Sequence, residues 1–226
     1  KFVCGVGDEN GNVKERITLP TTTPDEVFKE VIDYFRDKGI QALGIGTFGP
    51  VDLDRSSKTY GYITSTPKLQ WVQTNFVGVL QKEFKIPIGF DTDVNAAALG
   101  ETKWGAAKGL DSCVYMTIGT GIGVGAFVEG RLVHGLIHPE MGHMLVRRHP
   151  EDAFKGICPY HHDCLEGMAS GPAIERRWGK KGQDLAGDEK VWELEAFYIA
   201  QAISNLILVL SPKKVVIGGG VSKQKQ

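Results

Sequence analysis

One glycine-rich stretch, residues 115–131, constrains the fold of this chain more than any other. It overlaps a β-branched and aromatic run at 114–118, which predicts a buried strand. Glycines then stand at positions 119, 121, 123 and 125, and a second apolar run at 126–128 ends at an expected turn, Glu129–Gly130. Because glycine has no Cβ, another group can approach the backbone of such a bend closely.

Two interpretations of this bend stay open. Exposed backbone N–H groups, together with the hydroxyls of Thr117 and Thr120, can hold an anion such as a phosphate. A tight hairpin in which glycine only relieves crowding explains the same spacing. No helix follows at once, so the stretch is neither a Walker P-loop nor a Rossmann fingerprint.

Composition excludes several classes of protein. The chain has 226 residues, of which 42% are apolar and 23% charged, as in an ordinary globular protein of one large or two small domains. A net charge of −1 argues against nucleic acid or an anionic membrane as partner. The apolar run at 196–210 is interrupted by Gln201, Ser204 and Asn205, so we expect no membrane span. Four cysteines and no signal peptide predict a cytoplasmic protein in which Cys4 and Cys113 are core thiols.

Strand and helix patterns alternate along the chain. A helix is expected to begin at Pro24 after the N-cap Thr23, and a long helix is expected at 188–210. A short helix is expected around 77–84, and strands are expected at 2–6, 13–19, 42–47, 59–65, 86–90, 114–118 and 215–217. This order predicts two sheets, each covered by helices.

Three strand ends carry residues suited to a site. Gly49-Pro50-Val51-Asp52 follows the strand at 42–47 and is either a ligand loop or a plain turn. Asp93 follows the strand at 86–90 and precedes an alanine-rich helix, where it is a candidate N-cap. Glycines 218–220 follow the strand at 215–217 and suggest close approach of a nucleotide to the backbone.

All six histidines lie between positions 134 and 162. Cys158, His161 and Cys164 form a Cys-x2-His-x2-Cys knuckle, and with His143 they offer the two thiolates and two imidazoles that suit a structural zinc ion. His162 is an alternative to His161, and His138 or His149 to His143. The other interpretation is a solvated polar loop with reduced thiols.

Two glutamates flank this loop. Glu140 precedes His143 and Glu166 follows Cys164, so together their carboxylates could accept hydrogen bonds from vicinal hydroxyls. Either one alone is equally well explained as a surface residue.

These blocks, taken in order, resemble the ROK sugar kinases, and most closely the fructokinase branch found in bacilli and their relatives. The matching blocks are 49–52, 93–101, 118–123, 140–143 with the Cys/His loop, 164–166, 169–173 and 218–221. The resemblance covers nearly the whole chain.

The resemblance implies an α/β protein with the actin-like ATPase (ribonuclease H-like) fold, in which two domains surround a cleft. Residues 1–104 would form the smaller domain and 105–226 the larger one. Asp93 would be the general base that takes a proton from a sugar hydroxyl. Further roles implied by the resemblance are sugar binding by Gly49, Pro50, Thr92, Glu140, His143 and Glu166, and nucleotide binding by Thr120, Gly121, Pro172, Trp178, Gly219 and Gly220.

The implied reaction is ATP-dependent phosphorylation of a hexose, with fructose to fructose 6-phosphate as the leading case and Mg²⁺ as cofactor. Zn²⁺ would be structural, bound by His143, Cys158, His161 and Cys164, and the protein would be a homodimer. Family members commonly have Asn at the position of Thr92, which places glucose preference in question. Relative to the family, we also expect the chain to be shortened at both ends.

Other functions remain as alternatives. Glucokinase or mannokinase activity falls within the same family. The family also includes sugar-responsive repressors, but these carry a helix-turn-helix segment and a basic recognition helix, and neither is recognisable in this sequence.

Overall fold

The computed structural model describes residues 1–223 and divides into two compact units. The first unit comprises Lys1–Ala96 and His134–His138, and the second comprises Ala97–Val133 and the chain from Pro139 onward. The division falls inside helix α3 (Asp93–Lys103), upstream of the boundary expected after residue 104. Each unit has its own hydrophobic core.

Two pairs of strands form the framework of the first unit. β1 (Phe2–Gly7) and β2 (Val13–Leu19) are antiparallel, whereas β3 (Leu43–Thr47) and β6 (Ile88–Thr92) are parallel. β4 (Tyr62–Ile63) and β5 (Thr74–Asn75) make a third, short pair. The strand expected at 59–65 is therefore only two residues long.

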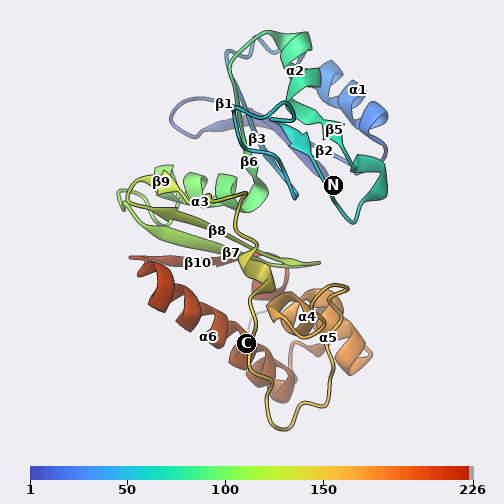
Figure 1. The fold of residues 1–226 in the computed structure, drawn as a ribbon, viewed down its shortest axis with the longest axis vertical. Coiled ribbons are helices and arrows are strands. Elements are labelled where there is room, and N and C mark those ends of the chain that lie inside the picture. Colours follow the sequence, from blue (N-terminus) through green and yellow to red (C-terminus); the bar gives the residue numbers. More distant parts are fainter. Residues whose placement is uncertain (224–226) are drawn as a thin grey trace. The chain divides into compact units, whose positions relative to one another are not determined.

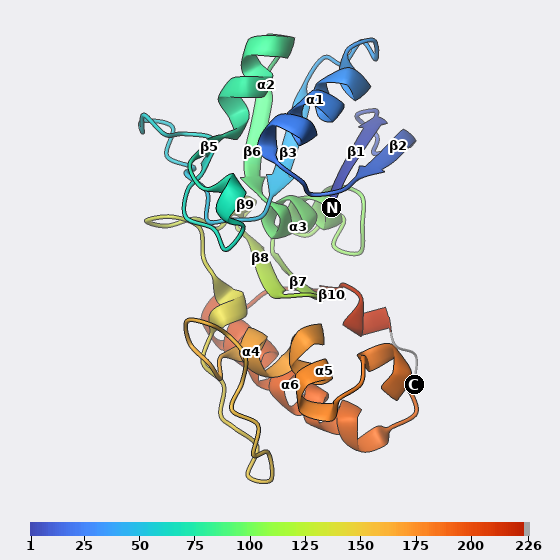
Figure 2. The ribbon, with the colours of Figure 1, turned by 90° about the vertical axis from the view of Figure 1, so that its right-hand side faces the viewer.

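Two helices, α1 (Pro24–Phe35) and α2 (Phe76–Phe84), lie side by side in the first unit (Figures 1 and 2). Between the strands and helices, aromatic rings build the core: Trp71, in the 3₁₀ helix η1 (Leu69–Trp71), stacks on Phe2 and Phe76. Trp71 is 1% exposed. Such large rings bury much apolar surface, so this small unit has a substantial core of its own.

The second unit is built on a sheet of four strands in the order β10-β7-β8-β9. β7 (Cys113–Ile118) and β8 (Ile122–Val128) form the predicted hairpin, β9 is Arg131–Leu132, and β10 (Val215–Gly218) runs parallel to β7. Glu129 and Gly130, both at positive φ, form the predicted turn.

Helices cover both faces of this sheet. Alternate residues of β7 point to opposite faces, and Val114, Met116 and Ile118 pack with Tyr198, Ala202 and Leu206 of α6 (Glu189–Leu210). Cys113 faces the other way and packs with Ala98 of α3. α4 (Leu165–Ala169) and α5 (Gly171–Trp178) lie on the α6 side of the sheet (Figure 2). Short 3₁₀ helices occur at Met141–His143, Gly182–Leu185 and Val221–Lys223.

α6 is long and apolar enough to cross a membrane by length and composition alone, which the interrupted run at 196–210 did not lead us to expect. It is the one helix of this kind among the described residues. One side of α6 is buried in the core of the second unit, and a core helix passes the same test, so this property is weak support for a membrane span.

Candidate active site

Asp93 is the first residue of α3, at the carboxyl end of β6. The prediction that it caps this helix is wrong, because the hydroxyl of the buried Thr92 accepts the hydrogen bond from the Asn95 N–H (3.2 Å). One oxygen of Asp93 accepts only from the next residue, at 2.9 Å from the Val94 nitrogen. Thr92 thus caps α3, and the side chain of Asp93 is exposed.

The surroundings of Asp93 act on its pKa in both directions. Although the residue has an open side, burial of the carboxyl group raises its pKa, and this effect is the largest. The Val94 N–H, the ammonium of Lys68 and the imidazole of His138 favour the charged form and oppose the rise. The carboxylate is therefore more basic than an ordinary aspartate, as a proton acceptor should be.

The Gly49–Pro50 loop leaves the same edge of the sheet as Asp93. The last pair in the parallel register of β3 and β6 is Thr47 with Thr92, so the residues after both strands emerge together. Ligands of α/β proteins bind at such carboxyl edges. At the start of this loop, the ammonium of Lys68 lies 3.7 Å from the centre of the Phe48 ring. Burial lowers the pKa of Lys68, whereas Asp93 raises it.

In the second unit, three segments meet at the tip of the β7–β8 hairpin. The Gly171 N–H, where α5 begins, donates to the Gly119 carbonyl (2.7 Å), and a Cβ on Gly171 would lie 2.9 Å from that oxygen. Gly219, at φ 97°, lies so close to Ile118 that a Cβ would be 2.2 Å from its carbonyl oxygen. Glycine is therefore required here for close backbone packing.

The nucleotide residues predicted from the sequence divide into two groups. Those at the convergence are Thr120, Gly121, Pro172, Gly219 and Gly220; of these Thr120, Pro172 and Gly220 are exposed. Trp178, at the other end of α5, packs instead against Ile174 and its neighbours, with its indole N–H buried and unpaired.

Glu166 connects the glycine bend to the Cys/His loop. One carboxylate oxygen accepts a hydrogen bond from the Ile122 N–H (2.9 Å) and would lie 2.6 Å from a Cβ on Gly121. The other oxygen lies 4.0 Å from Nε2 of His143. Glu140, the second predicted glutamate, is exposed and precedes the 3₁₀ turn that carries His143.

The structure gathers His143, Cys158, His161 and Cys164 into one cluster, with the four ligand atoms within 4.8 Å of one another. Nδ1 of His143 lies 3.4 Å from the Cys164 sulfur and 3.6 Å from the Cys158 sulfur, and Nδ1 of His161 lies 3.7 Å from the Cys158 sulfur. The edges of a zinc tetrahedron are about 3.3–3.8 Å. These three distances match such edges, and two sulfurs with two imidazole nitrogens are a donor set that suits zinc.

The knuckle is shaped by close packing. The Cys158 and His162 backbones exchange two hydrogen bonds, and the His161 N–H donates to the Cys158 sulfur (3.4 Å). A Cβ on Gly156 or Gly167 would lie 2.0 or 1.9 Å from the His162 carbonyl oxygen. These contacts hold Gly156, Cys158 and Gly167 closely around the His162 carbonyl.

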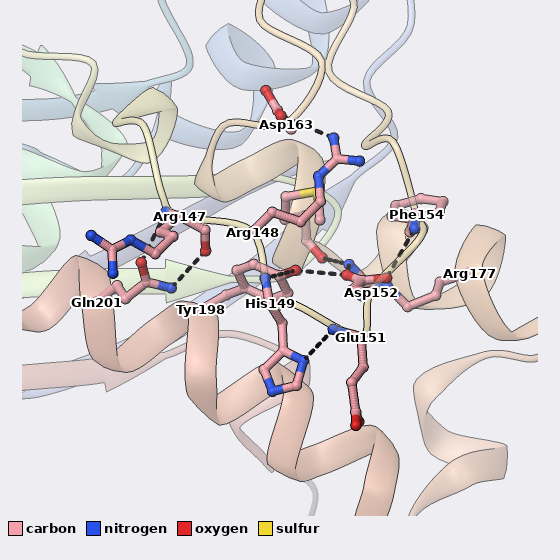
Figure 3. Close-up of polar contacts among 11 residues, drawn as sticks. Arg147, Arg148, His149, Glu151, Asp152, Phe154, Asp163, Arg177, Tyr198 and Gln201 are labelled. Atoms are coloured by element: carbon pink, nitrogen blue, oxygen red, sulfur yellow. Dashed lines mark hydrogen bonds and ion pairs between the residues drawn. The ribbon is translucent and has the colours of Figure 1, made fainter.

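A buried polar network, which the sequence did not reveal, anchors the chain that leads into this knuckle (Figure 3). Asp152 pairs with Arg177 (3.1 Å) and accepts a hydrogen bond from the Tyr198 hydroxyl (2.6 Å). Nearby and more exposed, Arg148 pairs with Asp163 (3.0 Å). The pairing of Asp152 with α5 and α6 joins residues far apart in sequence, which local patterns cannot report.

A hollow of about 640 Å³ lies beside this network and beside Pro172. It is lined by Ala153, Phe154, Lys155, Gly156, Ile157, Pro172 and Arg176. Two of these side chains, Lys155 and Arg176, are cationic.

Comparison with known proteins identifies the family. The model of the ROK family matches residues 1–226. The chain belongs to the ROK family. Over its whole length it is 62% identical to a putative fructokinase of Bacillus subtilis, covering 76% of that protein. It is also 48% identical to a fructokinase of Pediococcus pentosaceus, again over the whole chain and 78% of that relative.

A solved structure has the same fold. The ROK hexokinase of Thermus thermophilus superposes with a TM-score of 0.78 at 30% identity, over 97% of this chain and 78% of that one. The predicted actin-like α/β fold of the ROK kinases is thereby confirmed.

Proposed function

We propose that this ROK protein is an ATP-dependent fructokinase, which converts fructose to fructose 6-phosphate. Similarity to two fructokinases over the full length of the chain carries this proposal. Two local features support it: the carboxylate of Asp93, whose pKa is raised, and the glycine-lined bend at the tip of the β7–β8 hairpin.

Asp93 is the general base in this proposal. Its carboxylate accepts the proton of the attacking sugar hydroxyl while that oxygen bonds to the γ-phosphorus, and the bond from phosphorus to the leaving oxygen breaks. Gly49 and Pro50 form one side of the sugar site. Thr92 positions Asp93 by capping α3, since its hydroxyl is occupied by the Asn95 N–H.

In this proposal Glu140, His143 and Glu166 bind sugar hydroxyls. Thr120 and Gly121 hold phosphate oxygens, and Pro172, Gly219 and Gly220 line the nucleotide side. Trp178 is not included on the nucleotide side, because it packs in the core under α5 with Ile174. Mg²⁺ bound with ATP supplies neutralising charge when present.

The zinc ion is structural in this proposal. All four ligands come from the chain, which leaves no open position for a substrate. The imidazole of His143 has its Nδ1 toward the sulfurs and its Nε2 toward Glu166, so one ring can bind the metal and also orient a sugar contact. We also propose a cytoplasmic homodimer, in which residues 1–104 form the smaller domain of each kinase chain and residues 105–226 the larger one.

A panel of sugars with ATP and coupled ADP detection tests the proposal. We expect kcat/KM to be highest for fructose, with mannose and glucose slower. A preference for glucose, or no turnover with any hexose by the intact protein, would contradict it; glucokinase or mannokinase activity and a sugar-responsive repressor remain the alternatives.

A further inference from the structure

The segment His134–His138 returns from the second unit to the first and carries a histidine at each end. Between them, Leu136 is 102% exposed and Ile137 52% exposed, so the middle of the segment lies in solvent. The two end residues are held by side-chain contacts instead. Each of the two imidazoles contacts a different part of the first unit.

His138 contacts the loop that follows β3. It is 5% exposed, and its Nε2 accepts a hydrogen bond from the Val51 N–H (3.1 Å). A Cβ on Gly49 would lie 2.9 Å from Cε1 of the same ring, so the ring lies directly against the glycine.

His134 contacts the end of the neighbouring strand, β6. Its Nε2 lies 2.8 Å from one oxygen of Asp91, two residues before Asp93. The other oxygen of Asp91 accepts from the Asn95 side chain (2.8 Å) and from the Thr92 N–H (2.8 Å). His134 is thus joined to the turn that opens α3.

We propose that His134 and His138 are positioning residues of the sugar site, and that the segment between them is a clasp across the carboxyl ends of β3 and β6. His138 fixes the Gly49–Pro50 loop, and His134 fixes the turn that carries Asp93. The clasp keeps the loop that binds the sugar in register with the base that deprotonates it. Neither histidine needs to touch the substrate.

This inference rests on the proposed roles of Gly49, Pro50 and Asp93. It predicts a selective kinetic defect. His138→Ala in the intact kinase should raise KM for fructose roughly 10- to 100-fold, because displacing the Gly49–Pro50 loop by about 1 Å would weaken its contacts with the sugar by such a factor. KM for ATP should stay unchanged. His134→Ala should lower kcat more than it raises KM, since His134 contacts the turn that carries Asp93, the proposed base.

Two further variants separate positioning from folding. His138→Gln places an amide oxygen near the Val51 N–H and should recover most of the affinity for fructose. Gly49→Ala should mimic His138→Ala by pushing the ring aside, and it should do little more in a chain that already carries His138→Ala, because the ring is then gone. The matched control is His149→Gln, whose ring accepts only a local hydrogen bond from the Glu151 N–H (3.2 Å); it should behave as wild type.

The outcomes distinguish this inference from the function it rests on. An unchanged KM for fructose in His138→Ala, or an equal rise in KM for ATP, overturns the clasp. Additive effects of Gly49→Ala and His138→Ala overturn it as well. Failure of the base assignment would appear separately, as turnover that survives in Asp93→Asn.

Discussion

At the scale of single residues, the central feature is that Thr92, and not the adjacent Asp93, caps helix α3. Either side chain can cap a helix, and from sequence alone Asp93 was the better candidate. In the structure the buried hydroxyl of Thr92 takes the backbone N–H, and the carboxylate of Asp93 is spared. Two adjacent residues of similar capping ability can be told apart only by their geometry.

Thr92→Ala should therefore destabilise the protein by about 1 kcal/mol, the usual loss for an N-cap. Thr92→Asn should retain stability, because asparagine caps at least as well as threonine. Denaturant unfolding of the three proteins measures this. If alanine and asparagine had equal effects, the capping role of Thr92 would be wrong.

Lys68 offers a prediction about pH. Its charge opposes the rise in the pKa of Asp93, so Lys68→Met should raise that pKa further. A base must be deprotonated to act, so the acid limb of the profile of kcat/KM against pH should move to higher pH. The exposed Lys82, on α2, provides the matched control Lys82→Met, which should leave the limb in place. A limb that moves to lower pH, or does not move, would contradict this account.

At the scale of elements, sequence patterns predicted those parts of the fold that depend on local signals. The β7–β8 hairpin follows from alternating glycines between two β-branched runs, and α6 (Glu189–Leu210) begins one residue after the predicted 188. The pairing of β3 with β6 and of β4 with β5, each as a separate two-stranded sheet, was not predicted, since it depends on contacts distant in sequence. For the same reason, neither the bond from Val51 to His138, 87 residues apart, nor the Asp152 network was foreseen.

The Cys/His knuckle is the element whose stability should depend on metal. Burial raises the pKa of the Cys164 thiol to about 11, so without metal it is protonated at neutral pH. Binding zinc requires the thiolate, and we expect proton release on binding and tighter binding at higher pH. His161→Asn should lose zinc and lower the melting temperature.

His162→Asn is the matched control, because His162 is adjacent, exposed and outside the cluster. It should keep one zinc ion per chain by elemental analysis. Equal zinc content in both variants, or none in the wild type, would show that the cluster is not a zinc site.

At the scale of the whole molecule, the buried Glu195 should set how stability depends on pH. It is 2% exposed, both its oxygens are unpaired, and burial raises its pKa to about 8. Between its unfolded pKa near 4.5 and this value, the folded state holds a proton that the unfolded state has lost. The free energy of unfolding should therefore fall with rising pH, by at most about 1.4 kcal/mol per pH unit.

Glu195→Gln should remove this dependence, since the amide carries no titrating proton. Chemical unfolding at pH 5, 6.5 and 8 (roughly spanning the window) would show a flatter profile for the variant than for wild type. Parallel profiles for the variant and wild type would contradict this prediction, because they would mean that ionisation of Glu195 in the folded protein costs no free energy. Charged groups elsewhere in the chain are common to both proteins and cancel in the comparison.

The claim on which the function depends is that Asp93 takes the proton from the sugar. The most direct test compares fructose phosphorylation and fructose binding in the intact wild-type protein and in Asp93→Asn. We predict that the variant binds fructose with similar affinity by calorimetry but loses phosphorylation by at least about 100-fold, the lower range for a general base. Phosphorylation at a rate close to wild type in Asp93→Asn would contradict the account.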